Sequence, residues 1–228
     1  MIFKKLKSYN NSFFLLKGCS KEHPFFISKN SFTLIEVLFV VLILGIVLQF
    51  TIPNFNKHSS LDTATKNLKL HLNFARYMAH IDNKQSYDDL EYLKKSWTLK
   101  FQRCKEEIGG LYYVVYSDMS GGTAAFKKED TLKDPLNKKY LYSNNDCSAS
   151  DDESKYVLLT KEYGVTHVNV SCNTTSAIGQ ISFAYDGNVY TSLGSDMNML
   201  ENRCNITISD QENNSKTIFI EPYTGYIH

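Results

Sequence analysis

The stretch that decides the fold reads KNSFTLIEVLFVVLILGIVLQFTIPNF and covers Lys29 to Phe55. Between Phe32 and Pro53 the only ionisable side chain is Glu36. A run of about 21 such residues is long enough for a helix to cross a hydrocarbon core roughly 30 Å thick. The sequence therefore predicts a transmembrane helix at residues 32–53.

Charge is distributed unevenly around this run. Residues 1–31 hold six lysines and one acid and are net +5, whereas the rest of the chain is net −4 and the whole chain is +1. Lysines in front of an apolar helix stay in the cytoplasm. We therefore predict a single-pass inner-membrane protein with a cytoplasmic leader and a periplasmic C-terminal domain. An ordinary secretory signal does not fit, because its apolar core is shorter and a small-residue cleavage site follows it.

The residues Phe32 to Glu36, FTLIE, followed by an apolar helix, resemble the start of the type IV prepilins and type II secretion pseudopilins. The resemblance implies that a prepilin peptidase cuts between Ser31 and Phe32, removes residues 1–31 as a leader and N-methylates Phe32. The family normally has Gly before the cut, where this chain has Ser31. Gly45 and Pro53 fall where the family usually has helix-loosening residues.

An acid inside an apolar helix is costly unless it is paired or solvated, so Glu36 is a functional candidate. Cleavage before Phe32 would create a partner, a free amine on the same or a neighbouring subunit. We assign Glu36 to register in an assembled filament, with an interfacial position of its carboxylate as the alternative. Pro53 is expected to kink or locally melt the helix. Gly45 either loosens the helix or lets another helix pack closely.

Beyond Asn54 the pattern changes from helix to strands. Apolar residues recur at three- and four-residue steps, which predicts an amphipathic helix within residues 54–85. Those residues are Leu61, Ala64, Leu68, Leu72, Ala75 and Ala79. Alternating and β-branched runs then predict a β-rich domain at 86–228, with a hairpin turn at Asp186 to Asn188. The fold class is therefore predicted as α+β and pilin-like, with a long, partly transmembrane N-terminal helix packed on a C-terminal antiparallel sheet.

The order of these elements resembles one branch of the family, the H-type minor pseudopilins and their FimT-like relatives. The matching points are the helix with Phe74 to Ala79, the strand with Trp97, the strand and turn from Ile181 to Gly187, and a last strand ending at Thr224 and Gly225. The segment from Ser117 to Ser154 has no counterpart.

Removal of the leader leaves an even number of cysteines, which suggests two disulfides in an extracytoplasmic domain. The four are Cys104, Cys147, Cys172 and Cys204. Three pairings are possible. Sequence order favours Cys172 with Cys204 and Cys104 with Cys147. No pair has the spacing of a zinc or redox site.

The remaining polar residues give little support for catalysis. His58, His71 and His80 have spacings that do not place them close together on one face, and we interpret the histidines as surface residues. Acidic residues around Asn144 to Glu153 lack the spacing of a calcium loop. We expect no enzyme activity, no cofactor and no metal. Five lysines are candidates for weak contact with DNA phosphates, although acids are interleaved with them. They are Lys127, Lys128, Lys133, Lys138 and Lys139.

The predicted function is that of a minor pseudopilin or pilin subunit, which joins or primes a periplasmic filament. The resemblance implies other pilin-like subunits, a prepilin peptidase, the membrane and an inner-membrane assembly platform with its ATPase as partners. Type II secretion, a type IV pilus and a pseudopilus for DNA uptake all remain open, as does a DNA- or substrate-binding tip subunit. An ordinary single-span protein with an uncut leader is the other alternative.

Overall fold

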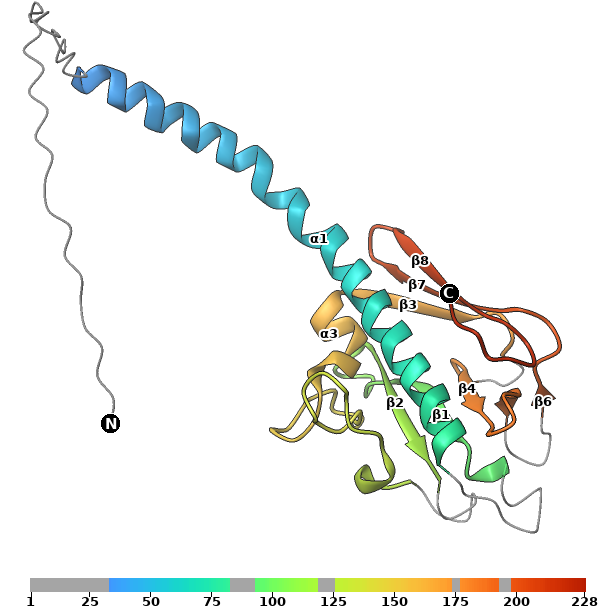
Figure 1. The fold of residues 1–228 in the computed structure, drawn as a ribbon. Helices are drawn as coiled ribbons and strands as arrows, with labels where there is room; N and C mark the ends of the chain where they lie inside the picture. The colour runs from blue at the N-terminus through green and yellow to red at the C-terminus, as the bar shows by residue number, and fades with distance from the viewer. Residues whose placement is uncertain (1–32, 83–92, 119–125, 174–176, 193–197) are drawn as a thin grey trace, which may run out of the picture. The chain divides into compact units, whose positions relative to one another are not determined.

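The computed structural model describes residues 33–82, 93–118, 126–173, 177–192 and 198–228, with the backbone alone for 48–59 (Figure 1). The chain divides into two compact units, Met1–Val47 and Leu48–His228. Within the first unit, the described residues are the beginning of helix α1, which has the bounds Leu34–Ile81. The second unit contains the rest of α1 and all the strands.

The part of α1 within the second unit is amphipathic. All six apolar residues that the sequence places on one stripe are buried, so this prediction is confirmed. They are Leu61, Ala64, Leu68, Leu72, Ala75 and Ala79. The same side of the helix also buries His71, which is the only ionisable residue of the described part of α1 with no exposed surface. One face of this part of α1 is thus covered by the domain itself.

The larger sheet is antiparallel and has the strand order β2-β1-β4-β5-β6. Its strands are β1 (Trp97–Arg103), β2 (Leu111–Ser117), β4 (Gln180–Phe183), β5 (Val189–Ser192) and β6 (Asn198–Met199). Strands β4 and β5 form the predicted hairpin, in which the backbone N–H of Ala184 donates to the carbonyl of Asn188 at 2.9 Å. Gly187 has φ +90° in this turn, a conformation that residues with a side chain rarely adopt.

The smaller sheet is also antiparallel, with the order β3-β7-β8. Its strands are β3 (Val165–Val170), β7 (Cys204–Asp210) and β8 (Ser215–Ile220). In β3 the side chains of Val165, Val168 and Val170 are buried, whereas Thr166, His167 and Asn169 are exposed. The chain end returns to β8, where the backbones of Phe219 and His228 exchange hydrogen bonds at 3.0 and 3.1 Å. The β8 edge of this sheet is therefore partly paired with the C-terminal residues.

A largely irregular segment, residues 126–158, lies against β2 and explains why nearly every β2 residue is buried. Leu132 donates to the Val115 carbonyl at 2.8 Å, and Val115 donates to the Leu141 carbonyl at 3.1 Å. The rings of Phe126 and Tyr116 stack at 4.0 Å. The segment includes the short 3-10 helices η1 (Lys128–Asp130) and η2 (Lys155–Val157), and α3 (Leu159–Tyr163) follows it. The region without a counterpart in the resembled family thus forms part of the packed domain.

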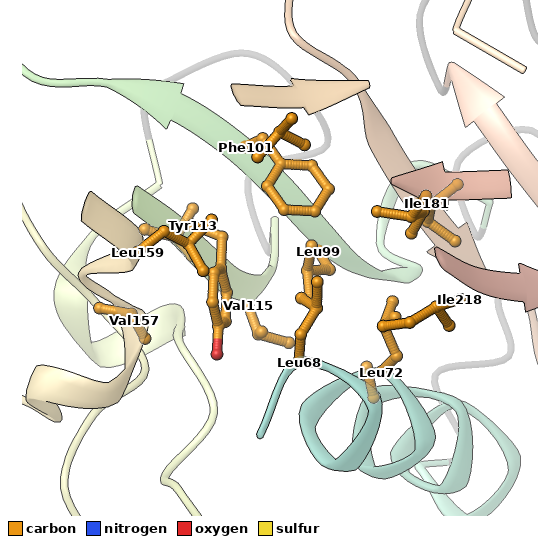
Figure 2. Packing of buried hydrophobic residues seen from close by; sticks show 14 of the residues in the cluster. Leu68, Leu72, Leu99, Phe101, Tyr113, Val115, Val157, Leu159, Ile181 and Ile218 are labelled. Carbon is orange, nitrogen blue, oxygen red and sulfur yellow. The ribbon is translucent and has the colours of Figure 1, made fainter. Parts of the chain in front are cut away.

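Both sheets and α1 contribute to one apolar core. Figure 2 shows Leu68 and Leu72 of α1 beside Leu99 of β1 and Ile218 of β8. Burial of this kind contributes about 25 cal/mol for each Å² of apolar surface removed from water. The amphipathic part of α1 is therefore held by packing against residues from both sheets.

The predicted fold class is wrong. The described residues form two antiparallel sheets and a few helices, and they contain no helix long and apolar enough to cross a membrane. The same finding contradicts the predicted localisation as a single-pass inner-membrane protein with a transmembrane helix.

Candidate functional site

The candidate site is the beginning of α1, residues 34–47, where apolar side chains are exposed on every face of the helix. Its twelve large apolar residues are between 48% and 85% exposed. Exposed apolar surface on this scale marks a site of interaction with other molecules. A helix that is apolar on all sides is normally buried on all sides. Residues 34–47 are therefore an unusually exposed apolar segment among the described residues.

Glu36 lies in the first turn of α1 and is exposed. The helix begins after Thr33, whose carbonyl accepts the backbone N–H groups of Glu36 at 2.9 Å and Val37 at 3.3 Å. A carboxylate at this end of a helix interacts favourably with the helix dipole. Glu36 is thus available to a partner from outside the chain. Ser31 and Phe32, the predicted processing site and the predicted site of N-methylation, lie outside the described residues.

Gly45 lies in the same exposed segment. A Cβ atom added to it would meet nothing within 4 Å, so packing within the chain does not require a glycine there. Both predicted roles, helix loosening and close approach of another helix, remain predictions. Pro53 lies inside the bounds of α1, where only the backbone is described, and the predicted kink at Pro53 is not tested.

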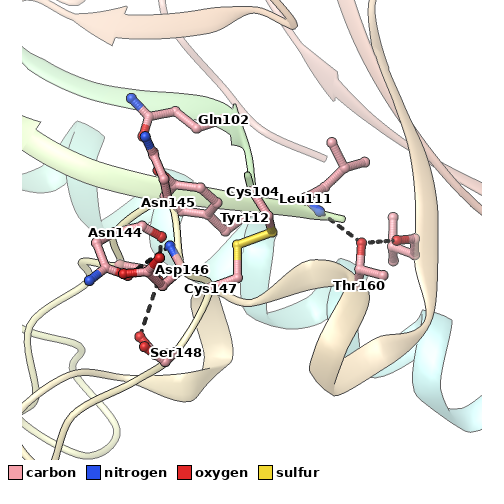
Figure 3. Close-up of a disulfide and its surroundings, with 12 residues drawn as sticks. Gln102, Cys104, Leu111, Tyr112, Asn144, Asn145, Asp146, Cys147, Ser148 and Thr160 are labelled. Carbon is pink, nitrogen blue, oxygen red and sulfur yellow. Dashed lines mark hydrogen bonds between the residues drawn. A yellow bond between two sulfur atoms is a disulfide. The ribbon is translucent and has the colours of Figure 1, made fainter. Parts of the chain in front are cut away.

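Two disulfides join the segments around the sheets and confirm the predicted pairing. Cys104–Cys147 joins the residue after β1 to the 126–158 segment, and Cys172–Cys204 joins the region after β3 to the start of β7. Figure 3 shows the first bridge next to Tyr112. The Tyr112 hydroxyl is 2.8 Å from Asn145 Oδ1, which ties β2 to the same 126–158 segment. Burial raises the pKa of Tyr112 to about 12, and nearby Tyr142 adds to this, so the hydroxyl keeps its proton.

The five predicted lysines lie on or beside the 126–158 segment, but they differ in their contacts. Lys128 pairs with Asp152 at 2.8 Å, and this hydrogen bond is the main reason why the pKa of Lys128 is raised. Lys133 lies over the ring of Tyr140, 4.9 Å from its centroid. Lys138 and Lys139 are exposed. Lys133, Lys138 and Lys139 therefore form a stretch of exposed lysines.

The acidic residues around 144–153 make contacts within the chain. Asp146 forms an ion pair with Lys105, and Asp152 pairs with Lys128. In the part of the chain that the structure describes, no group of three or more potential ligands is arranged to hold a metal ion.

A pocket of about 420 Å³ lies between Ser60 of α1, α3 and the turn after β7. Its lining includes Glu162, Asp210 and Glu212. Asp210 Oδ1 accepts the backbone N–H groups of Glu212 at 2.9 Å and Asn214 at 3.0 Å, so this carboxylate stabilises its own turn. The hydroxyls of Ser60 and Thr160 donate to the backbone carbonyls of Tyr163 at 2.9 Å and Val165 at 2.6 Å, so neither donates to a carboxylate of the lining.

The interpretation of His71 as a surface residue is wrong, because its side chain is fully buried. It lies between Tyr113 and Asp134, and Ser154 donates a 2.6 Å hydrogen bond to Asp134. The sequence carried a signal for this burial, since His71 continues the three- and four-residue spacing from Leu68 to Leu72. Asp134 had no such signal, because it lies in an irregular segment. Ser154 bonds to the carboxylate and not to the imidazole, so the set lacks the arrangement of a hydrolase triad.

No family model, no curated protein and no solved structure matches this chain.

Proposed function

We propose that the chain is a pilin-like minor subunit, which joins or primes a filament after a prepilin peptidase cuts between Ser31 and Phe32. The observation that carries the proposal is the exposed apolar surface of residues 34–47, directly at the FTLIE motif. In a filament, equivalent segments of neighbouring subunits cover one another and remove this surface from water. Type II secretion and type IV pilus-like systems both use subunits of this kind.

Glu36 supports the proposal by its position. It is the only ionisable residue from 33 to 47, and it lies at the exposed start of the helix. Cleavage before Phe32 creates a free amine close to it in sequence. The amine of one subunit and Glu36 of a neighbour would form a charge pair between apolar helices, where water is scarce and the interaction is stronger than at an open surface. Such a pair would set the register of the packed helices.

The role is structural, and we assign no catalytic residue and no cofactor to it. The partners are other pilin-like subunits, the prepilin peptidase and an inner-membrane assembly platform with its ATPase. The two disulfides suit a domain exposed to an oxidising compartment, where such bonds persist.

A photo-reactive amino acid at Val41 in the native host tests the proposal. Val41 is 63% exposed within the apolar segment, and the matched control is His167, an exposed residue of β3. We expect covalent adducts with pilin-like subunits at position 41 and far fewer at 167. Equal and low crosslinking at both positions would contradict the assembly role of residues 34–47.

The exposed lysines of the 126–158 segment favour a second candidate, a DNA- or substrate-binding tip subunit of a DNA-uptake pseudopilus. Lys133, Lys138 and Lys139 are exposed, and none of them has a carboxylate partner among the described residues. Replacement of all three by alanine should weaken retention of linear DNA. The slope of the logarithm of the binding constant against the logarithm of the salt concentration should become shallower by about 0.9 for each lost phosphate contact. Lys128→Ala is the matched control, because Lys128 already pairs with Asp152. Absence of DNA retention at low salt would exclude this candidate.

A further inference from the structure

The pocket between Ser60, α3 and the turn after β7, which we call the α3 pocket, is rich in hydrogen-bond acceptors. Glu162, Asp210 and Glu212 supply three carboxyl groups, and the described lining contains no lysine, arginine or histidine. The hydroxyl groups of Ser60 and Thr160 donate to backbone carbonyls at 2.9 and 2.6 Å, so they offer only lone pairs to a ligand. A positively charged group with several hydrogens, such as an ammonium group, complements this lining.

The α3 pocket is open to a side chain from another molecule. Lys155 lies 3.6 Å from Glu162, but Lys155 is 62% exposed and does not line the pocket. Exposed ion pairs of this kind contribute little to stability, so Glu162 remains available to another cation. Ligand pockets span roughly 300–1,000 Å³. The α3 pocket, at about 420 Å³, lies at the lower end of this range and suits one or two long side chains.

A second feature of the same domain carries the complementary charge. It is the turn of residues 134–139, in which Lys138 and Lys139 are both exposed. Leu136 lies in the same turn and is 60% exposed. Tyrosine, arginine and exposed apolar side chains are common at protein interfaces, whereas lysine is depleted there. Lysines at an interface therefore need carboxylates opposite them, and the α3 pocket provides three.

Backbone hydrogen bonds hold the 134–139 turn in a fixed shape. The N–H of Lys138 donates to the Asp134 carbonyl at 2.8 Å, and the N–H of Asp134 donates to the Lys139 carbonyl at 2.7 Å. Asp134 is fully buried, so the turn is anchored in the core. Lys138 has φ +63°, a conformation that is uncommon for residues other than glycine. A lysine in this conformation points to a function of its side chain, and a preformed turn loses little freedom on binding.

We infer that two copies of the chain bind each other here, with Lys138 and Lys139 of one copy against the carboxylates of the α3 pocket of the other. The occupant is a second copy because one domain carries both surfaces, with opposite charges. Contact between two unlike surfaces can continue from copy to copy, as in a filament. The inference goes beyond the proposed function, since it does not use residues 34–47 and stands if that proposal fails.

Carbodiimide crosslinking of the full-length chain in mild detergent tests the inference, because this reagent joins an amine to a carboxyl group in direct contact. Unlabelled and nitrogen-15-labelled chains are mixed, so that only contacts between copies give peptide pairs of mixed isotope. We expect mixed pairs that join Lys138 or Lys139 to Glu162 or Glu212. Their absence, or pairs of a single isotope alone at these positions, would overturn the inference.

An exchange of charges tests the same contact without crosslinking. Lys138→Glu with Lys139→Glu makes the turn acidic, and Glu162→Lys with Glu212→Lys makes the pocket basic. Asp210 is left unaltered because it stabilises its own turn. Each double variant alone should associate at least about tenfold more weakly in sedimentation experiments, because like charges then face each other. A mixture of the two should associate again, and a mixture that does not would contradict the pairing.

Two further variants serve as controls. Glu106→Lys with Glu107→Lys reverses two exposed acids outside the pocket and should leave association unchanged. Lys138→Gly with Lys139→Ala removes both ammonium groups and should still fold, because glycine readily adopts the positive φ at residue 138. We expect this variant to lose association. If it retains less linear DNA but associates as before, the turn binds DNA and the inference is overturned.

Discussion

Two parts of helix α1 differ in how far their apolar residues are buried. From Leu61 to Ala79 the apolar residues form one stripe, and the domain covers that stripe almost completely. From residues 34 to 47 they occur on every face, and about half or more of each large side chain remains exposed. The period of the pattern explains the first case, because a stripe needs only one covering surface. An unbroken apolar run needs cover on all sides, which we propose comes from other subunits.

The largest effect that would test this comparison comes from truncating one leucine in each part. Leu72→Ala removes a fully buried side chain and should cost about 2–5 kcal/mol of unfolding free energy. Leu42→Ala changes an exposed side chain and should stay within about 0.5 kcal/mol. Urea unfolding followed by the fluorescence of Trp97, the single tryptophan, measures both. Similar losses for the two variants would break the comparison.

Removal of a disulfide should have the next largest effect, confined to the covered region. Replacing both Cys104 and Cys147 by alanine opens a link across 43 residues and should cost about 2–4 kcal/mol. Crosslinking at Val41 should persist, because the bridge lies in the other unit of the chain. Urea unfolding and the crosslinking assay together measure the two consequences. Loss of crosslinking in a variant that remains folded would show that the two regions depend on each other.

Acid should destabilise the covered region through Asp134. The pKa of Asp134 is lower in the folded protein than in the unfolded chain, where it is about 3.9. The carboxylate therefore stabilises the fold at pH values above about 3.9, and this contribution is lost as the pH falls through the pKa of the folded state. We expect the unfolding free energy to decrease between pH 5 and pH 3 in urea titrations. Asp134→Asn lowers stability at pH 7 and should show a smaller further loss in acid. An equal acid loss in both proteins would assign the effect to other carboxylates.

Gly45→Ala should have the smallest effect on the isolated chain. The added Cβ meets nothing within 4 Å, and alanine favours a helix over glycine by up to about 1 kcal/mol. Helix content from circular dichroism should therefore stay constant or rise slightly. If another helix approaches closely at Gly45, the same variant should reduce crosslinking at Val41. Unchanged crosslinking would favour the helix-loosening role.

The sequence allowed some of these features to be predicted, for physical reasons that differ between regions. The buried stripe of α1, the hairpin at Asp186 to Asn188 and the disulfide pairing follow local spacing, turn chemistry and chain order. The fold class and the localisation were wrong, because both relied on a membrane-spanning helix, and the described residues contain no helix long and apolar enough to cross a membrane. The buried position of Asp134 depends on contacts between α1 and an irregular segment, which no local pattern encodes.

The mass of the N-terminal peptide of the protein from its native host tests the central claim most directly. The account predicts that most molecules begin at Phe32 with one added methyl group, and that residues 1–31 are absent. Substitution of Ser31 by a bulky residue should then block this processing and abolish crosslinking at Val41. Molecules that begin at Met1, or that keep any of the lysine-rich residues before Ser31, would contradict the proposal of a processed filament subunit.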